Sequence, residues 1–254
     1  MSSSKASHVE TAKRPFVKRI MALSPRHSLW EVWSDFITMF ACALSNRFDR
    51  AHFEEREAMY MKIIGKYDEK ERKVFPELVA DVVLALEENP EQDFLGSSYM
   101  ELELGNSHAG QFFTPYDVCR MMASVGGSSL ALRVMEKGHA SINDCACGAG
   151  ATLIAACHEA GKQLAILGRN WQHHILVTAQ DIDFTVGMMC YIQLSLIGAA
   201  GYVKIGNSIT DPMRAGDSKK NYWYTPMYFS DVWQWRRIWQ RVDALTNEKK
   251  GDSE

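Results

Sequence analysis

The sequence predicts an α/β protein in which a partial parallel sheet follows a helical N-terminal region. Between residues 140 and 205, candidate strands and helices alternate in the order strand, helix, strand, helix, strand. Parallel strands need long crossover connections, so this order at this spacing favours a parallel sheet. Residues 14–104 instead carry apolar side chains at helical intervals. We therefore divide the chain into a lead at 1–13, a helical region at 14–104, a sheet-containing core at 105–212 and a C-terminal segment at 213–254.

The N-terminal region reads as a short lead followed by helices. The lead is rich in Ser and has no apolar core, so we expect it to be disordered and not a secretory signal. Ser28 and Glu31 stand at capping-box spacing in front of a helix. "FEEREAMYMKIIGKY" and "ERKVFPELVADVVLALEEN" predict two further helices, with Pro76 interrupting the second or starting a turn in it. In the first helix the apolar residues that recur at helical intervals are Trp30, Trp33, Phe36, Ile37, Phe40 and Leu44.

The core begins with a marked helix start. In "QFFTPYDVCRMM", Thr114 can be the N-cap, Pro115 suits the first helical position, and Asp117 completes a capping box. The strand candidates that follow are "ASINDCA", "HHILVTAQDID" and "YVKIGN". The helices predicted between them are "GATLIAACHEAG" and "FTVGMMCYIQLSLIGAAG".

The C-terminal segment loses this regular pattern after Asn207. Its last element, "DVWQWRRIWQRVDAL", predicts an amphipathic helix that is followed by a solvated tail. The tryptophans and arginines of this helix could bind single-stranded nucleic acid, but we favour packing of its apolar stripe on the core or on a partner. The stripe consists of Val232, Trp235, Trp239 and Val242.

Composition excludes several classes of function. The chain has 254 residues, a net charge of -3 and 46% hydrophobic residues, which suits a soluble globular protein without broad nucleic-acid contact. No apolar run approaches the ~18 residues that span a membrane. The six cysteines include no CxxC pair, which favours a reduced, cytoplasmic protein. Cys145 and Cys147 have no His or Cys partner at a ligand spacing, so we predict no metal site.

Two segments at strand ends could hold a ligand. In "INDCACGAGAT", the run from Asp144 to Gly150 lies between a strand and a helix, where small residues let a ligand approach free N–H groups. The alternative is an ordinary strand–helix turn. Asp181 ends the next strand, where a carboxylate can accept hydrogen bonds from ribose hydroxyls. The alternative is a surface acid, and Asp183 also fits an N-cap role for the next helix.

A third segment, Gly110 to Pro115, places two phenylalanines between a glycine and a helix cap. These rings either pack on the core as a hydrophobic staple or belong to a loop that folds over the mouth of a pocket.

Together the three segments resemble the adenine-N6 DNA methyltransferases that are related to modification subunits of type I restriction systems. The family's "G-Q-F-F/Y-T-P" element stands intact at Gly110–Pro115, and its "D-P-A-C-G-S-G" loop reads "DCACGAG" at Asp144–Gly150. The resemblance implies a Rossmann-like methyltransferase sheet and S-adenosylmethionine (SAM) as the cofactor. It places Gln111, Phe112, Thr114 and Pro115 near the methionine end of SAM. It also places Asp144 and Gly148 under its amino acid moiety, Asp181 at the ribose and Asn207 near the adenine ring. The full set of implied SAM-binding residues is Gln111, Phe112, Phe113, Thr114, Pro115, Asp144, Ala146, Gly148, Gly150, Thr152, Asp181, Ile182 and Asn207.

The family's catalytic motif, (N/D/S)-P-P-(Y/F/W), is missing. Its polar side chain and prolyl carbonyl hold the target adenine's amino group, and its aromatic ring stacks on the flipped base. The nearest substitutes are Asp211-Pro212-Met213 and the stretch that holds the weak catalytic candidates Thr225, Pro226 and Tyr228. The second stretch has no buried-strand run before it, and threonine is a poorer acceptor for an amino group than asparagine.

A seven-stranded methyltransferase sheet also needs more strands than the ~45 residues after the third strand supply, so either the sheet is incomplete or another chain completes it. We predict a SAM-dependent adenine-N6 DNA methyltransferase-like protein, one part of a multi-subunit or split enzyme, with DNA and a specificity or complementing subunit as partners. The alternative is a catalytically inactive SAM-binding module with a regulatory, interaction or anti-restriction role. A different SAM-dependent reaction is a third possibility.

Overall fold

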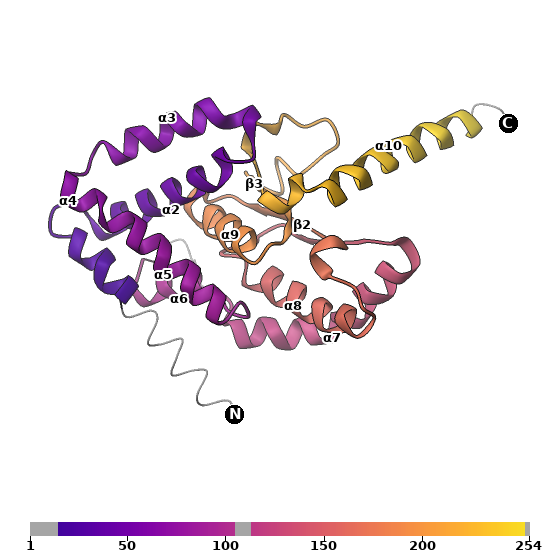
Figure 1. Cartoon of the computed structure of the whole chain (residues 1–254), viewed down its shortest axis with the longest axis horizontal. Coiled ribbons are helices and arrows are strands. Elements are labelled where there is room, and N and C mark those ends of the chain that lie inside the picture. The colour runs from indigo at the N-terminus through magenta and orange to yellow at the C-terminus, as the bar shows by residue number, and fades with distance from the viewer. Residues whose placement is uncertain (1–14, 105–112, 252–254) are drawn as a thin grey trace.

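A computed structural model describes residues 15–104 and 113–251, so the predicted lead at 1–13 lies outside the described residues. Figure 1 shows a helical N-terminal region beside a small sheet with its helices, which confirms the predicted fold class. After a helix over residues 15–23, the N-terminal helices are α2 (Leu29–Asn46), α3 (Phe53–Ile64), α4 (Glu69–Arg72), α5 (Val74–Glu88) and α6 (Phe94–Glu101). The remainder comprises α7 (Tyr116–Lys137), β1 (Ala140–Asp144), α8 (Ala151–Ile166), β2 (Ile175–Asp181), α9 (Phe184–Leu196), β3 (Ala200–Ile205), β4 (Tyr222–Tyr224) and α10 (Asp231–Gly251).

The sheet has the order β1-β2-β3-β4 within the described residues. β1–β2 and β2–β3 are parallel, as predicted, and β4 runs antiparallel to β3 with Val203 opposite Trp223. β4 was not predicted, because three aromatic residues in a polar, turn-rich stretch give too short a pattern to read as a strand. Trp223 fixes its position by packing on the rings of Tyr191 and Phe184 of α9.

Helices cover one face of this sheet. Because β1, β2 and β3 are neighbours in chain order, right-handed crossovers place α8 and α9 on the same side. Val177, Ala179 and Val203 are fully buried on that side. On the other face, Ser141 and Asn143 of β1 are exposed.

The N-terminal helices extend the helical layer. The predicted N-cap of α2 is confirmed, since Ser28 Oγ accepts a hydrogen bond from Glu31 N at 3.2 Å. The side chain of Glu31 bonds Lys66, whereas a complete capping box would bring it back to Ser28. Trp33, Phe36, Ile37 and Phe40 are buried, whereas the side chain of Trp30 points outward and is 55% exposed.

A buried arginine fastens this region to the sheet. Arg56 of α3 is 3% exposed and donates to Asp49 Oδ2 at 2.9 Å, to Tyr222 O at 2.7 Å and to Ser45 Oγ. Its guanidinium carbon lies 3.9 Å from the ring centroid of Trp223. A planar cation is thus paired, hydrogen-bonded and stacked at once, which joins α2, α3 and β4.

Two helix predictions need correction. Thr114 is not the N-cap of α7: Pro115 has an extended ψ of 137°, and its carbonyl accepts from Val118 N and Cys119 N, so the helix starts after it. The apolar stripe of α10 does not pack on the core, so of its two predicted places only packing on a partner stays a prediction. Trp235 and Trp239 are each 61% exposed, and Trp233 is the buried tryptophan of this helix, with Nε1 donating to Gln172 O.

No helix in the described ranges combines the length and apolar character that spanning a membrane requires.

Candidate functional site

Three predicted site residues lie at the carboxyl ends of three neighbouring strands. Asp144 ends β1, Asp181 ends β2, and Asn207 comes shortly after β3. Because these strands are parallel, their carboxyl ends meet at one edge of the sheet, which is where ligands bind in open α/β sheets.

The loop from Cys145 to Gly150 is held by Asp144 and by β2. Asp144 Oδ1 accepts from Ala146 N at 3.1 Å, and its Oδ2 accepts from Thr152 Oγ1 at 3.0 Å, so one carboxylate joins both ends of the loop. Cys147 N donates to Gln180 O at 3.0 Å, which ties the middle of the loop to β2.

Two glycines in this loop are needed for their conformation. Gly148 and Gly150 have φ values of 54° and 96°, in the left-handed region that favours glycine. A Cβ on Gly150 would also lie 2.9 Å from Cys190 Sγ, so a side chain there would clash with α9. Glycine is therefore needed at position 150 for the loop to pack on α9.

Asp181 supports the same loop from β2. Its Oδ2 accepts from Gly148 N at 2.9 Å and its Oδ1 accepts from Asp183 N at 3.0 Å. Burial raises the pKa of this carboxyl above its ordinary value, although the backbone hydrogen bonds act in the opposite direction. The next side chain, Ile182, is 68% exposed, and Asp183 caps α9 by accepting from Val186 N, as predicted.

Asn207 shapes the turn after β3. Its Oδ1 accepts from Ile209 N at 2.9 Å and from Thr210 N at 3.2 Å. The side chain of Gln180 reinforces this turn by donating to Gly206 O and Asp211 O.

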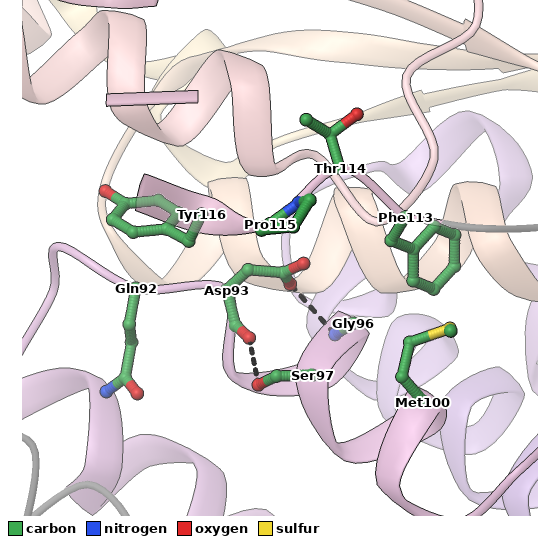
Figure 2. A pocket seen from close by; sticks show the side chains of 9 residues that line it. All are labelled: Gln92, Asp93, Gly96, Ser97, Met100, Phe113, Thr114, Pro115 and Tyr116. Carbon is green, nitrogen blue, oxygen red and sulfur yellow. Dashed lines mark hydrogen bonds between the residues drawn. The ribbon is translucent and has the colours of Figure 1, made fainter. Parts of the chain in front are cut away.

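A cavity of about 440 Å³ lies beside this edge, between the start of α6 and the start of α7. Figure 2 shows Phe113 and Met100 on one side of it and Tyr116 and Gln92 on the other, with Asp93 between them. Phe113, Thr114 and Pro115 were predicted to contribute to the site, whereas Gln111 and Phe112 lie outside the described residues. The complete lining is Gln92, Asp93, Gly96, Ser97, Met100, Phe113, Thr114, Pro115 and Tyr116.

Phe113 stands between this cavity and the glycine loop. Its ring carbon Cδ1 would lie 3.3 Å from a Cβ on Gly148, and its ring centroid is 5.5 Å from that of Tyr99. The predicted residues therefore form two groups on either side of one aromatic ring. Thr114 and Pro115 line the cavity, while Asp144, Gly148 and Asp181 are on the loop side.

Gln193 of α9 connects the two groups and was missed in the sequence. It is fully buried, and its Nε2 donates to Asp93 Oδ1 at 2.8 Å and to Ala149 O at 2.9 Å. Its Oε1 accepts from Leu95 N at 3.0 Å. One side chain thus holds the glycine loop and the start of α6 in a fixed relation. The available signal was a lone amide in the otherwise apolar run "GMMCYIQLSL".

The loop cysteines serve packing. Cys147 and Cys190 are buried against each other beneath the loop, while Cys145 is exposed. Among the residues that the structure describes, no group of three or more His, Cys, Asp or Glu side chains could hold a metal ion.

The weak catalytic candidates lie at the other end of the sheet. Thr225 is fully buried, its hydroxyl donates to Ala199 O at 2.7 Å, and it accepts from Gly201 N at 3.0 Å. Because β4 is antiparallel to β3, the residues after β4 sit beside the amino end of β3, away from the loop. Tyr228 packs there on Tyr224, with the guanidinium of Arg237 4.0 Å from its ring centroid. We therefore assign no catalytic role to Thr225, Pro226 or Tyr228.

A protein-family model described as N-6 DNA Methylase matches residues 93–252. The matched range contains the glycine loop, all strands of the described sheet and every residue that lines the cavity except Gln92. Comparison with curated proteins gives no match.

Proposed function

The chain belongs to the N-6 DNA methylase family, and from this premise we propose that it binds SAM at the carboxyl edge of the sheet and serves adenine-N6 methylation of DNA. The observation that carries the proposal is the loop of Asp144–Gly150, which two carboxylates hold in place beside an apolar cavity.

The acceptor oxygens and the apolar surface at this edge suit the ribose and adenine of SAM. Each carboxylate oxygen of Asp181 accepts one backbone N–H, and each can accept a second hydrogen bond. Two ribose hydroxyls would satisfy these remaining positions. The exposed side chain of Ile182 offers an apolar surface for the adenine ring, and Asn207 lies after the neighbouring strand.

The cavity suits the methionine end and the reacting groups. Phe113, Met100 and Pro115 line it with apolar surface that excludes water, and Asp93 adds a carboxylate. SAM supplies an electrophilic methyl group on a sulfonium. The residues of this chain would hold and orient that group, and the rate of methyl transfer would then depend on its alignment with the acceptor nitrogen.

The described residues of this chain do not supply a group that holds the target adenine, because Thr225 and Tyr228 lie at the opposite edge of the sheet. We propose that a complementing or specificity subunit brings the adenine-holding motif and DNA contacts. The unpaired cysteines and the DNA substrate support a cytoplasmic location.

A second candidate function is a SAM-binding module without catalysis, with a regulatory or anti-restriction role. The burial of the Thr225 hydroxyl in main-chain hydrogen bonds favours it, since that group is occupied structurally.

A methyl-transfer assay with labelled SAM and DNA separates the two. We expect label in N6-methyladenine when the chain is combined with its complementing subunit, and much less label with Asp181→Asn when SAM is below saturation. Unlabelled DNA in every combination, with SAM binding retained, would leave the binding module as the function.

A further inference from the structure

A nearly buried carboxylate stands inside the cavity at the start of α6. Asp93 is 7% exposed, and Figure 2 shows its side chain between the Tyr116 side of the cavity and the Phe113 side. The surface around it is largely apolar, with contributions from Met100 and Pro115. Burial of a carboxylate among apolar groups costs free energy unless polar partners compensate for it. Its surroundings therefore decide whether it serves only as a helix cap or also meets a ligand.

Two uncharged donors from distant parts of the chain orient this carboxylate. Asp93 Oδ1 accepts from Gly96 N at 2.8 Å, which caps α6, and from Gln193 Nε2 at 2.8 Å. Capping needs only the first of these bonds. The second comes from a fully buried residue of α9, which also holds the glycine loop through Ala149 O. Because neither donor is charged, these bonds fix the direction of the carboxylate and leave its negative charge in place.

The glycine at position 96 leaves room for the carboxylate. A Cβ there would lie 2.1 Å from Asp93 Oδ2 and 2.7 Å from its Cγ, far inside the ~3.5–4.0 Å of an ordinary contact between carbon atoms. Any other residue would therefore push the carboxylate out of its place. Since Asp93 and Gly96 both line the cavity, the glycine keeps the carboxylate at the cavity wall.

The electrostatic potential in the cavity favours a cation. The described residues that line it include no Lys, Arg or His. Burial raises the pKa of the Cys119 thiol, and the charge of Asp93 raises it further. Burial and the charges of Glu91 and Asp93 also raise the pKa of Tyr116. Phe113 and Tyr116 bring aromatic rings, whose faces attract cations. A cationic group of a ligand is thus favoured here over an anionic one.

SAM carries two cationic groups, its sulfonium and its α-ammonium. Of these, the ammonium has N–H groups that can donate a charge-assisted hydrogen bond to a carboxylate. On the loop side, both oxygens of Asp144 hold the loop, through Ala146 N and Thr152 Oγ1. The ring of Phe113 stands between loop and cavity, 3.3 Å from the place of a Cβ on Gly148. The flexible methionine arm is the part of SAM that can extend past this ring.

We propose that Asp93 binds the α-ammonium of the methionine arm and thereby selects ligands that carry this group. The proposal rests on the proposed function, since it takes SAM as the ligand of the glycine loop. Charge-assisted hydrogen bonds are about twice as strong as neutral ones, and a cavity of low polarity strengthens them further. Asp93 is then a specificity-determining residue, and a ligand that keeps adenine, ribose and sulfur but lacks the amino group binds weakly.

Calorimetric titrations of the full-length chain with SAM and two analogues test this assignment. S-adenosylhomocysteine has the ammonium but no sulfonium, and its desamino analogue has neither. The wild type should bind the desamino analogue about 10–100-fold more weakly than S-adenosylhomocysteine. Asp93→Asn keeps an acceptor oxygen for Gly96 N and Gln193 Nε2. It should weaken SAM and S-adenosylhomocysteine by about 10–100-fold and leave the affinity for the desamino analogue unchanged.

Asp117→Asn is the matched control. Asp117 carries the same charge next to Tyr116 in the chain, but its side chain is 92% exposed and does not line the cavity. This variant should leave all three affinities unchanged, because exposed charges are screened by solvent and salt. An equal loss in both variants would assign the effect to net charge and would contradict the role of Asp93.

The pattern across ligands separates the remaining outcomes. Equal weakening of all three ligands by Asp93→Asn would mean a structural role, and weakening of SAM alone would assign the sulfonium; either result overturns the proposal. If Asp93→Asn does not fold, the wild type decides, because equal affinity for S-adenosylhomocysteine and its desamino analogue overturns it and a preference for the amino group supports it. Absence of SAM binding by the wild type would contradict the proposed function as well, whereas SAM binding without this preference would contradict the role of Asp93 alone.

Discussion

Replacement of Gln193 by leucine tests whether this side chain holds the two halves of the site together. The substitution keeps the volume and removes three hydrogen bonds, to Asp93, Ala149 and Leu95. Each buried main-chain group left without a partner costs about 1–3 kcal/mol, and a bond to a carboxylate contributes about 1.5–3 kcal/mol. Better burial of leucine offsets part of this loss.

The expected net loss is about 3–5 kcal/mol in the free energy of unfolding, a large share of the 5–15 kcal/mol of an ordinary domain. For a protein of this size it corresponds to a Tm lower by roughly 6–20 °C. Thermal and urea unfolding followed by circular dichroism would measure it. The matched control is Ser195→Ala, whose hydroxyl bonds Tyr191 O within α9 and should cost about 1 kcal/mol or less. If the two variants lose the same small amount, Gln193 does not connect α6 to the loop.

Three further results are expected. Arg56→Met should lower the free energy of unfolding by about 3–5 kcal/mol in urea titrations, because it leaves a buried acid without its cation; an unchanged midpoint would refute this anchor. Burial lowers the pKa of His158, so the unfolded chain binds more protons than the folded chain below about pH 6.5. The free energy of unfolding should therefore fall from pH 7.5 to pH 5.5. The Tm measured across this range should fall less in His158→Gln than in the wild type, and an identical slope would contradict this role of His158. Gly150→Ala should cost more than Gly168→Ala in the same unfolding assay, since both have positive φ but only Gly150 meets Cys190; equal losses would count against the seating of the loop.

The parallel core was predictable because its signals are local. Each strand, its helix and the turn between them lie within about thirty residues, so periodicity and glycine placement suffice to read them. Asp144, Gly148 and Asp181 come together simply because parallel strands bring their carboxyl ends to one edge.

The parts that were missed depend on contacts between distant segments. β4 pairs only because Trp223 and Arg56 hold it, and its antiparallel direction carries Thr225 to the wrong edge for catalysis. The wall of the cavity at Asp93 comes from the N-terminal helices, and its link to the loop through Gln193 spans 100 residues. No local pattern contains this information.

Calorimetric titration of SAM into the purified full-length chain tests the cofactor site most directly. The wild type should bind one equivalent, and Asp181→Asn, which keeps an acceptor oxygen for Gly148 N, should bind about 10–100-fold more weakly, because a charged hydrogen bond contributes about 1.5–3 kcal/mol. Asp231→Asn, on the exposed start of α10, should leave the affinity unchanged. Absence of binding by the wild type, or equal affinity in Asp181→Asn, would contradict the assignment of this edge as the SAM site.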